Sequence, residues 1–269
     1  MLKVDHVFSG YGEEDILKDI SFKVGKSEFV CILGSNGCGK TTLLKTILAI
    51  LKPTKGKITI NDDDVHKMPE KLLAQQIAYI PQAHVPPFPF TVEDVVLMGR
   101  TPYLNRMAVP NALDVEKSNQ ALERLGMTNM AKKRYTELSG GQRQMVIIAR
   151  ALAQEPKMLV MDEPTANLDF GNQHIVFEQL IKLAHKDLSV LMVTHNPDHA
   201  LFCADETIIM KEGKVIDKGK TSAVVNESSM QEIYQTDVKI ASVDIPPQKQ
   251  IFICVPISKQ KFLLDHDAL

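Results

Sequence analysis

A charge excess of one sign, long apolar runs and paired cysteines are all lacking from this sequence of 269 residues. The formal net charge of −2 gives no electrostatic case for nucleic acid as a main partner. No apolar run approaches the ~18 residues of a membrane span, and Arg150 interrupts the best candidate at 145–153. The four cysteines form no Cys-x-x-Cys pair of the kind that binds zinc. The N-terminus lacks the apolar core of a secretion signal, so we expect a cytosolic protein that reaches any membrane through a partner.

Repeats and heptads are lacking as well. No unit of about 20–50 residues recurs, which argues against a solenoid or a propeller. The stretch between Lys40 and Leu138 shows no sustained heptads, which argues against a long coiled coil inside the chain. An Asn-Lys-x-Asp segment that would read guanine is also missing, which argues against a signalling GTPase. These absences leave an ordinary α/β protein as the expectation.

A glycine-rich segment lies between a strand pattern and a helix pattern. It fits G-x-x-x-x-G-K-[ST] and comprises Gly34, Ser35, Asn36, Gly37, Cys38, Gly39, Lys40, Thr41 and Thr42. Residues 28–33 form a short apolar run before it, and apolar residues recur at helical spacing after it. The backbone N–H groups of such a loop and the N-terminus of the following helix cradle phosphates. We therefore expect a bound nucleoside triphosphate, with Lys40 at the β- and γ-phosphates and the Thr41 hydroxyl on Mg²⁺.

An acidic pair ends a second apolar strand pattern, at 158–161. Asp162 has the position of a carboxylate that holds Mg²⁺ opposite Thr41, usually through water. Glu163, one residue further on, could polarise an attacking water as a general base. Two solvated acids that open a loop are the simpler alternative. Their place beside a phosphate loop favours the catalytic interpretation.

A second candidate anion site begins at Ser139, about a hundred residues after the phosphate loop. Ser139 and Gln142 have the spacing of a capping box, which predicts the start of a helix. Capping does not explain Gly140 and Gly141, because glycine in the first turn lowers helix stability. Glycines at these positions let an anion approach bare N–H groups. Since the chain already has its own phosphate loop, this helix end indicates service to the ATP of another molecule.

In this order, the motifs resemble those of the ATPase subunit of an ATP-binding cassette (ABC) transporter, over roughly residues 2–225. The resemblance implies an α/β fold: a P-loop NTPase (RecA-like) core with an N-terminal antiparallel β subdomain and an inserted helical signature subdomain. We expect an ABC ATPase domain at 1–225, with its helical lobe at about 83–155, and a C-terminal extension at 226–269.

The resemblance also implies cofactors and partners. ATP and Mg²⁺ would be bound, and two copies of the chain would sandwich two ATPs, each signature helix facing the partner's γ-phosphate. Integral membrane permease subunits would bind the pair, and a periplasmic or extracellular substrate-binding protein would act indirectly. No nucleic acid is expected. The implied location is the cytoplasmic face of the cell membrane, as a peripheral subunit.

Four further positions match the family pattern. Tyr11 matches the aromatic residue that stacks on adenine, and Gln82 matches the glutamine that senses Mg²⁺ and the membrane partner. Asp169 ends the Ala-Asn-Leu-Asp segment at 166–169, which resembles the loop that crosses the dimer interface. Ser-Ala-Leu-Asp is the commoner sequence of that loop in the family. His195 matches the histidine that contacts the γ-phosphate. Taken alone, each has a simpler explanation as a packing or surface residue, and only their order favours function.

The cargo is less well defined by the sequence. Residues 96–103 and the ending from Ile233-Tyr234 to Val255-Pro256 resemble importers of iron–siderophore, haem and cobalamin. Molybdate or tungstate importers can look alike. A non-transport ABC ATPase is the alternative from another class, but it would carry a coiled coil between the phosphate loop and the signature.

The remaining patterns predict elements and one reactive group. Strand patterns cover 1–33 and 56–80, helices are expected near 91–98 and at 115–125, and 226–269 should hold a short helix near Ile233 and a strand at 251–255. Residues 83–106, entered through the stiff Pro86–Pro89, are expected by resemblance to receive a permease helix. Cys38 lies near Lys40 and a helix N-terminus, which could lower its pKa and make it a reactive thiol.

Overall fold

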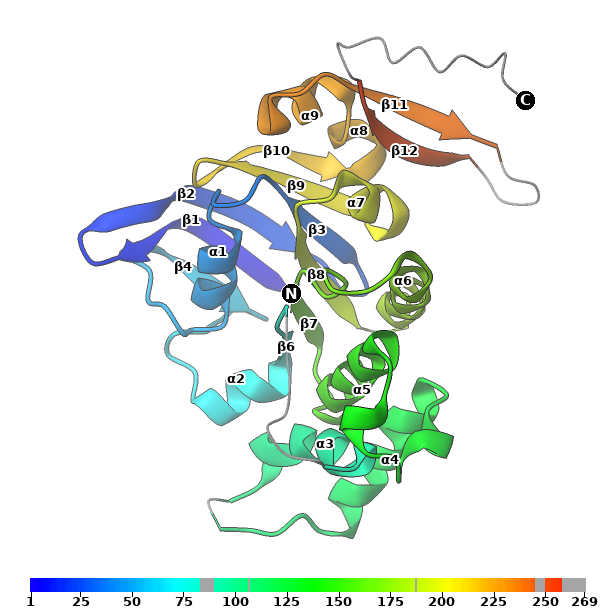
Figure 1. The fold of residues 1–269 in the computed structure, drawn as a ribbon. Coiled ribbons are helices and arrows are strands. Elements are labelled where there is room, and N and C mark those ends of the chain that lie inside the picture. Colours follow the sequence, from blue (N-terminus) through cyan, green and yellow to red (C-terminus); the bar gives the residue numbers. More distant parts are fainter. Residues whose placement is uncertain (83–89, 106, 187, 245–249, 258–269) are drawn as a thin grey trace, which may run out of the picture.

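The computed structural model describes residues 1–82, 90–105, 107–186, 188–244 and 250–257. Its centre is a six-stranded sheet in the order β10-β9-β3-β8-β7-β6 (Figure 1). The strands are β3 (Phe29–Leu33), β6 (Ile77–Ile80), β7 (Met158–Asp162), β8 (Ser189–Thr194), β9 (Glu206–Lys211) and β10 (Lys214–Lys220). All neighbours from β9 to β6 are parallel, and β10 is antiparallel to β9. Parallel strands bring their carboxyl ends to one edge of the sheet, where ligands bind in such folds.

The central strand β3 is apolar throughout because both of its faces are covered. Successive side chains alternate between the faces. Phe29, Cys31 and Leu33 join one core with the helices α5, α6 and α7, whereas Val30 and Ile32 join a second core with α1 and the N-terminal strands. The four helices are α1 (Lys40–Ile47), α5 (Gly140–Ala153), α6 (Phe170–Ala184) and α7 (Pro197–Cys203).

The N-terminal part forms a separate antiparallel sheet in the order β2-β1-β4-β5, as predicted. Its strands are β1 (Leu2–Tyr11), β2 (Glu14–Val24), β4 (Lys55–Ile60) and β5 (Asp63–Asp64). The strand pattern expected over 56–80 is wrong in one place, because α2 (Glu70–Gln76) lies between β5 and β6. Only Leu73 is buried among the residues of this short helix, so its sequence carries little helical periodicity.

A helical segment follows β6. It contains α3 (Val92–Leu97), η1 (Met98–Tyr103), α4 (Ala112–Arg124), η2 (Thr128–Met130), η3 (Tyr135–Glu137) and then α5. Thr91 and Asp94 form a capping box at the start of α3, as their spacing predicts. Arg100 is only 3% exposed and holds the segment together, since its Nε donates to Asp114 at 3.1 Å and its Nη1 to Glu155 at 2.9 Å. Residues 83–89 and 106 lie outside the described residues, and the expectation that 83–106 receive a permease helix stays a prediction.

The C-terminal elements lie at the β9–β10 end of the sheet, near α7, and pack into the same core as α5, α6 and α7. The elements there are α8 (Thr221–Val224), α9 (Glu227–Tyr234) and the hairpin of β11 (Val238–Val243) with β12 (Ile251–Pro256) (Figure 1). The predicted helix near Ile233 and the strand at 251–255 are confirmed, whereas β11 was not expected. Among the helices that the structure describes, none has the length and apolar character needed to cross a bilayer.

Candidate active site

Most of the predicted nucleotide residues follow the carboxyl ends of four adjacent parallel strands. The phosphate loop, residues 34–42, follows β3, and His195 follows β8. Asp162 ends β7 and Glu163 comes next, while Gln82 follows β6. Residues from distant parts of the sequence therefore meet at one edge because the strands that carry them are hydrogen-bonded neighbours.

The phosphate loop turns directly into α1. Gly39 is the N-cap residue, with a φ of 105°, a backbone conformation that residues with a Cβ rarely adopt. No side chain caps this helix, so its first N–H groups remain available to a ligand. Lys40 is 6% exposed and its Nζ donates to the carbonyls of Gly34 and Ser35 at 2.8 and 2.9 Å. The loop thus holds its lysine beside the helix N-terminus, the arrangement that binds phosphate.

Two of the three residues predicted at the metal, Thr41 and Asp162, face each other, whereas the Gln82 side chain contacts Glu163. The Thr41 hydroxyl donates to Asp162 Oδ2 at 3.3 Å. Burial raises the pKa of Asp162, and the hydrogen bond from Thr41 opposes that effect. A hydroxyl and a carboxylate oxygen are the hard ligands that Mg²⁺ prefers, and this cation usually keeps waters and phosphate oxygens as its other ligands. The pair fits Mg²⁺ on that chemistry, and the described residues hold no cluster of three or more His, Cys, Asp or Glu that would form a complete metal cage.

Both carboxylate oxygens of Glu163 contact other predicted site residues. His195 Nδ1 lies 2.6 Å from Glu163 Oε1, and Gln82 Nε2 donates to Glu163 Oε2 at 3.5 Å. The backbone of Glu163 has a φ of 44°, which costs a residue with a Cβ roughly 1–2 kcal/mol. Its N–H donates to the Val193 carbonyl at 3.1 Å, which holds this turn against β8. The structure therefore brings Glu163, His195 and Gln82 together.

A cavity of about 600 Å³ joins the loop to these acids. The residues that line it are Ile16, Asn36, Gly37, Gly39, Lys40, Thr41, Thr42, Gln82, Asp162, Glu163, Ala166, Asn167 and His195. Tyr11 is not among them. It is 51% exposed and its hydroxyl accepts a hydrogen bond from Lys45 at 3.1 Å. The sequence reasoning missed Ile16, which reaches the cavity from β2, and no local motif marks it.

Gly213 is a second residue that the motifs did not identify. Its N–H donates to the Cys38 carbonyl at 3.0 Å, and its carbonyl accepts from Lys18 N at 2.7 Å. It therefore ties the phosphate loop to the N-terminal sheet through the turn between β9 and β10. The Glu-Gly pair at 212–213 indicates the turn of the hairpin, but it does not indicate the contact with the phosphate loop.

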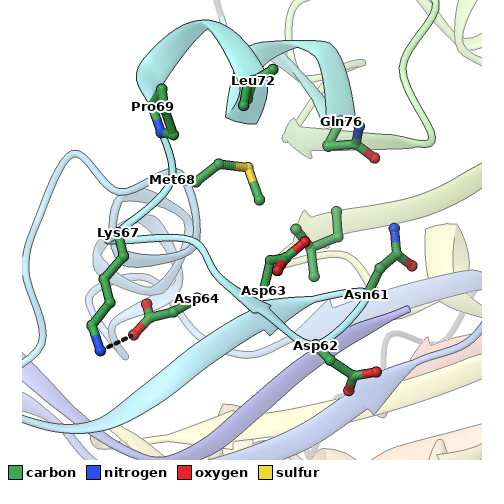
Figure 2. A pocket seen from close by; sticks show the side chains of 10 residues that line it. Asn61, Asp62, Asp63, Asp64, Lys67, Met68, Pro69, Leu72 and Gln76 are labelled. Carbon is green, nitrogen blue, oxygen red and sulfur yellow. Dashed lines mark ion pairs between the residues drawn. The ribbon is translucent and has the colours of Figure 1, made fainter.

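A hollow of similar size lies elsewhere and contains none of the motif residues. It has about 570 Å³ and lies between the β4–β5 turn and α2. Figure 2 shows Lys67 reaching toward Asp64, with a 3.7 Å ion pair, while Asp62 and Asp63 point in different directions. Cavity size alone therefore does not identify the site; the phosphate loop and the acids do.

The predicted signature residues form a capped helix end. The Ser139 hydroxyl accepts from Gln142 N at 3.3 Å, and Gln142 Oε1 accepts from Ser139 N at 3.1 Å, so the capping box is confirmed. A Cβ at Gly141 would lie 2.2 Å from Asn172 Oδ1, so packing against α6 already requires this glycine. Asp169 caps α6, because its Oδ1 accepts from Asn172 N at 2.9 Å. Packing thus explains part of what the sequence assigned to anion binding.

The prediction of a reactive Cys38 is wrong. The thiol is 5% exposed and belongs to the core between α1 and the N-terminal sheet. Burial raises the pKa of Cys38, and Lys40, although nearby, only partly opposes this. Proximity in sequence suggested a thiolate because it gave no information about which face of the loop the side chain occupies.

Comparison with known proteins agrees with this geometry. The family model of the ABC transporter matches residues 17–166. The Bacillus subtilis iron(3+)-hydroxamate import ATP-binding protein FhuC is 34% identical over 90% of each chain. The molybdate import ATP-binding protein MolC of Haemophilus influenzae is 38% identical over 78% of this chain and 79% of its own.

Two solved structures share the fold. One is an ABC transporter described as of metal-chelate type, in an inward-facing conformation, with 33% identity, a TM-score of 0.85 and coverage of 96% of this chain and 98% of the other. The second is a dimeric ATP-binding cassette with ADP and phosphate bound, with 29% identity, a TM-score of 0.68 and coverage of 82% and 99%. The chain therefore belongs to the ABC transporter family and is an ATP-hydrolysing subunit of a transporter.

Proposed function

We propose that the chain drives an importer whose cargo is a metal chelate of the iron–siderophore, haem or cobalamin type. The observation that carries this proposal is likeness along almost the whole chain. The iron(3+)-hydroxamate protein aligns over 90% of this chain, and the transporter of metal-chelate type matches 96% of it. Both alignments extend beyond the motifs that all ATP-binding cassettes share.

We infer that ATP binds in the cavity behind the phosphate loop. Lys40 would leave the two loop carbonyls for the β- and γ-phosphates, and the N–H groups of residues 37–42 would take the remaining phosphate oxygens. Thr41 and Asp162 would hold Mg²⁺, which supplies positive charge against the phosphates. Tyr11 would stack on adenine only at the outer rim, because it does not line the cavity itself.

Hydrolysis would be assisted by the group around Glu163. Its carboxylate accepts a proton from the attacking water, and His195 and Gln82, which contact its two oxygens, keep it oriented. The imidazole of His195 would in addition contact the γ-phosphate. These roles are the ones that the arrangement at the ends of β6, β7 and β8 supports best.

Two copies of the chain would close around two nucleotides, with Ser139, Gly140, Gly141 and Gln142 of each facing the nucleotide of the other, and Asp169 near the interface. The 29% identical cassette is dimeric with ADP and phosphate bound. The pair would work at the cytoplasmic face of the membrane with permease subunits, which the region 83–106 would contact. An external binding protein would deliver the cargo.

The test is reconstitution. The chain is co-expressed with its permease, placed in liposomes, and supplied with binding proteins loaded with ferric siderophore, haem, cobalamin or molybdate. We expect stimulation of ATP hydrolysis by one of the metal chelates. No stimulation by any of them would contradict the proposal.

Molybdate is the second candidate cargo. MolC is 38% identical, slightly more than the hydroxamate protein, but it aligns over 78% of this chain rather than 90%. Stimulation by the molybdate-loaded protein alone would favour this alternative.

A further inference from the structure

The segment from His195 to Asp198 is fastened at both ends by the C-terminal part of the chain. Tyr234, the last residue of α9, donates its hydroxyl to the backbone carbonyl of His195 at 2.6 Å. The backbone N–H of Cys254, in β12, donates to Asp198 Oδ1 at 2.7 Å. These contacts join residues 39 and 56 positions apart in the sequence. One end of the segment therefore depends on α9 and the other on the hairpin.

The elements that supply these two contacts are themselves firmly placed. Met230 and Ile233 of α9 are buried in the core. Glu227, at the start of α9, pairs with Lys239 of β11 at 2.8 Å, so helix and hairpin are joined. Figure 1 shows the hairpin beside α7, in agreement with the bond from Cys254. The segment is therefore bonded to elements that are themselves joined to the core and to each other.

The segment has little freedom of its own between these anchors. Asn196 caps α7 by accepting from Asp198 N at 2.9 Å, and its own N–H donates to Thr194 Oγ1 at 3.1 Å. The His195 imidazole, in contrast, is 49% exposed, so its place depends on its backbone and on the contact with Glu163. The carbonyl and the ring are both attached to the Cα of His195, so a bond that holds the carbonyl limits the positions open to the ring.

The Tyr234 hydroxyl is well suited to act as a donor. Burial, and then the neighbouring cysteine thiols, raise the pKa of Tyr234 above its ordinary value. The phenol therefore keeps its proton throughout the neutral pH range. A hydrogen bond of 2.6 Å from a phenol to a carbonyl is at the short end of the usual range, which fixes the carbonyl closely.

We propose that Tyr234 and Asp198 are positioning residues for ATP hydrolysis, which hold the His195 imidazole against Glu163 through the backbone of His195. The C-terminal part of the chain thereby sets the geometry of the pair that activates water. This inference rests on the function proposed above for His195 and Glu163. It assigns a role to a C-terminal region none of whose described residues lines the cavity.

The test is a double-mutant cycle in the full-length chain. Tyr234→Phe removes the hydroxyl and keeps the ring, so we expect kcat to fall roughly 5- to 50-fold with KM for ATP changed by less than about threefold. In a His195→Ala background the same change should alter kcat by less than about twofold, because the partner through which it acts is gone. A purely structural hydrogen bond would lower the rate equally in both backgrounds, and that result would overturn the proposal.

A control variant at Thr236 and two variants at Asp198 accompany this test. Thr236→Val removes another hydroxyl that donates to a backbone carbonyl, that of Tyr234, and should leave kcat within about twofold. Asp198→Ala should lower kcat, whereas Asp198→Asn keeps an oxygen acceptor and should restore it; this pair decides the question if Tyr234→Phe does not fold. Should His195→Ala itself leave kcat unchanged, the proposed function of His195 fails. Should His195→Ala lower the rate while Tyr234→Phe and Asp198→Ala do not, this inference alone fails.

Discussion

The cavity behind the phosphate loop and the start of α5 differ in the side-chain contacts that a single chain supplies to each of them. In the cavity, side chains from distant parts of the sequence contact each other, Thr41 with Asp162 and Glu163 with His195. At the start of α5, the capping bonds stay within Ser139–Gln142. The acids and the loop are therefore already oriented in one chain, whereas the helix end is held by its own capping box.

The loop at 166–169 joins the two regions. Asn167 lines the cavity, while a Cβ at Gly140 would meet the side chain of Leu168 at 3.3 Å. Asp169 then caps α6, on which Gly141 packs. The two regions are therefore neighbours in the structure, because one short loop contacts both of them. They differ in that charged and polar side chains line the cavity, whereas the first turn of α5 begins with two glycines.

The largest expected effect comes from removing the acid at the centre of the cavity. Glu163→Gln keeps the shape of the side chain but cannot accept the proton of the attacking water. We expect ATP hydrolysis to fall roughly 10²- to 10⁴-fold while ATP still binds, measured by steady-state kinetics and by nucleotide titration. Glu178→Gln, on the surface of α6, is the matched control. A hydrolysis rate near that of the wild type would show that another group is the base.

The two glycines of α5 sharpen the contrast between packing and anion binding. Gly141→Ala must displace Asn172 and should lower the free energy of unfolding by about 1–3 kcal/mol. Gly140→Ala meets Leu168 only at 3.3 Å and gains helix propensity, so its stability should change by less than about 1 kcal/mol. Chemical denaturation measures both. Equal stability of the two variants would contradict the packing explanation for Gly141.

The smallest effect concerns Cys38. Because burial covers the thiol and raises its pKa, alkylation of the native protein at pH 7 should be at least about tenfold slower than in denaturant. The sign of the pH effect follows: labelling should accelerate as pH rises toward the raised pKa. Mass spectrometry of the loop peptide gives the rate. Rapid labelling at neutral pH would mean that the thiol is open to solvent.

The sequence predicted the site better than it predicted the surroundings of the site. Glycines, Lys40 and the acids were identifiable because phosphate and metal chemistry need those residue types beside strand ends. Their meeting at one edge followed from the parallel pattern of the apolar strands. The burial of Cys38 was not predictable, because a thiol beside a lysine has the same sequence whether it faces solvent or a core.

The elements that were missed are those with little periodicity of their own. The helix α2 buries only Leu73, and β11 alternates weakly because its pairing with β12 leaves much of it exposed. The support for His195 from Tyr234 was equally hidden. The two residues are 39 positions apart, and a tyrosine at the end of a short helix carries no motif.

The most direct measurement asks whether the start of α5 serves the cavity of a second copy. Ser139→Arg blocks the helix end and Lys40→Ala disables the phosphate loop, so each variant alone should be inactive. When the two variants are mixed in equal amounts, some dimers contain one subunit of each. In such a dimer the loop of the Ser139→Arg subunit and the helix end of the Lys40→Ala subunit form one intact site. The account predicts recovery of about a quarter of the wild-type ATPase rate, since random pairing makes half of the dimers mixed and each mixed dimer keeps one of its two sites. A mixture no more active than its parts, at concentrations where mixed dimers are shown to form, would contradict it.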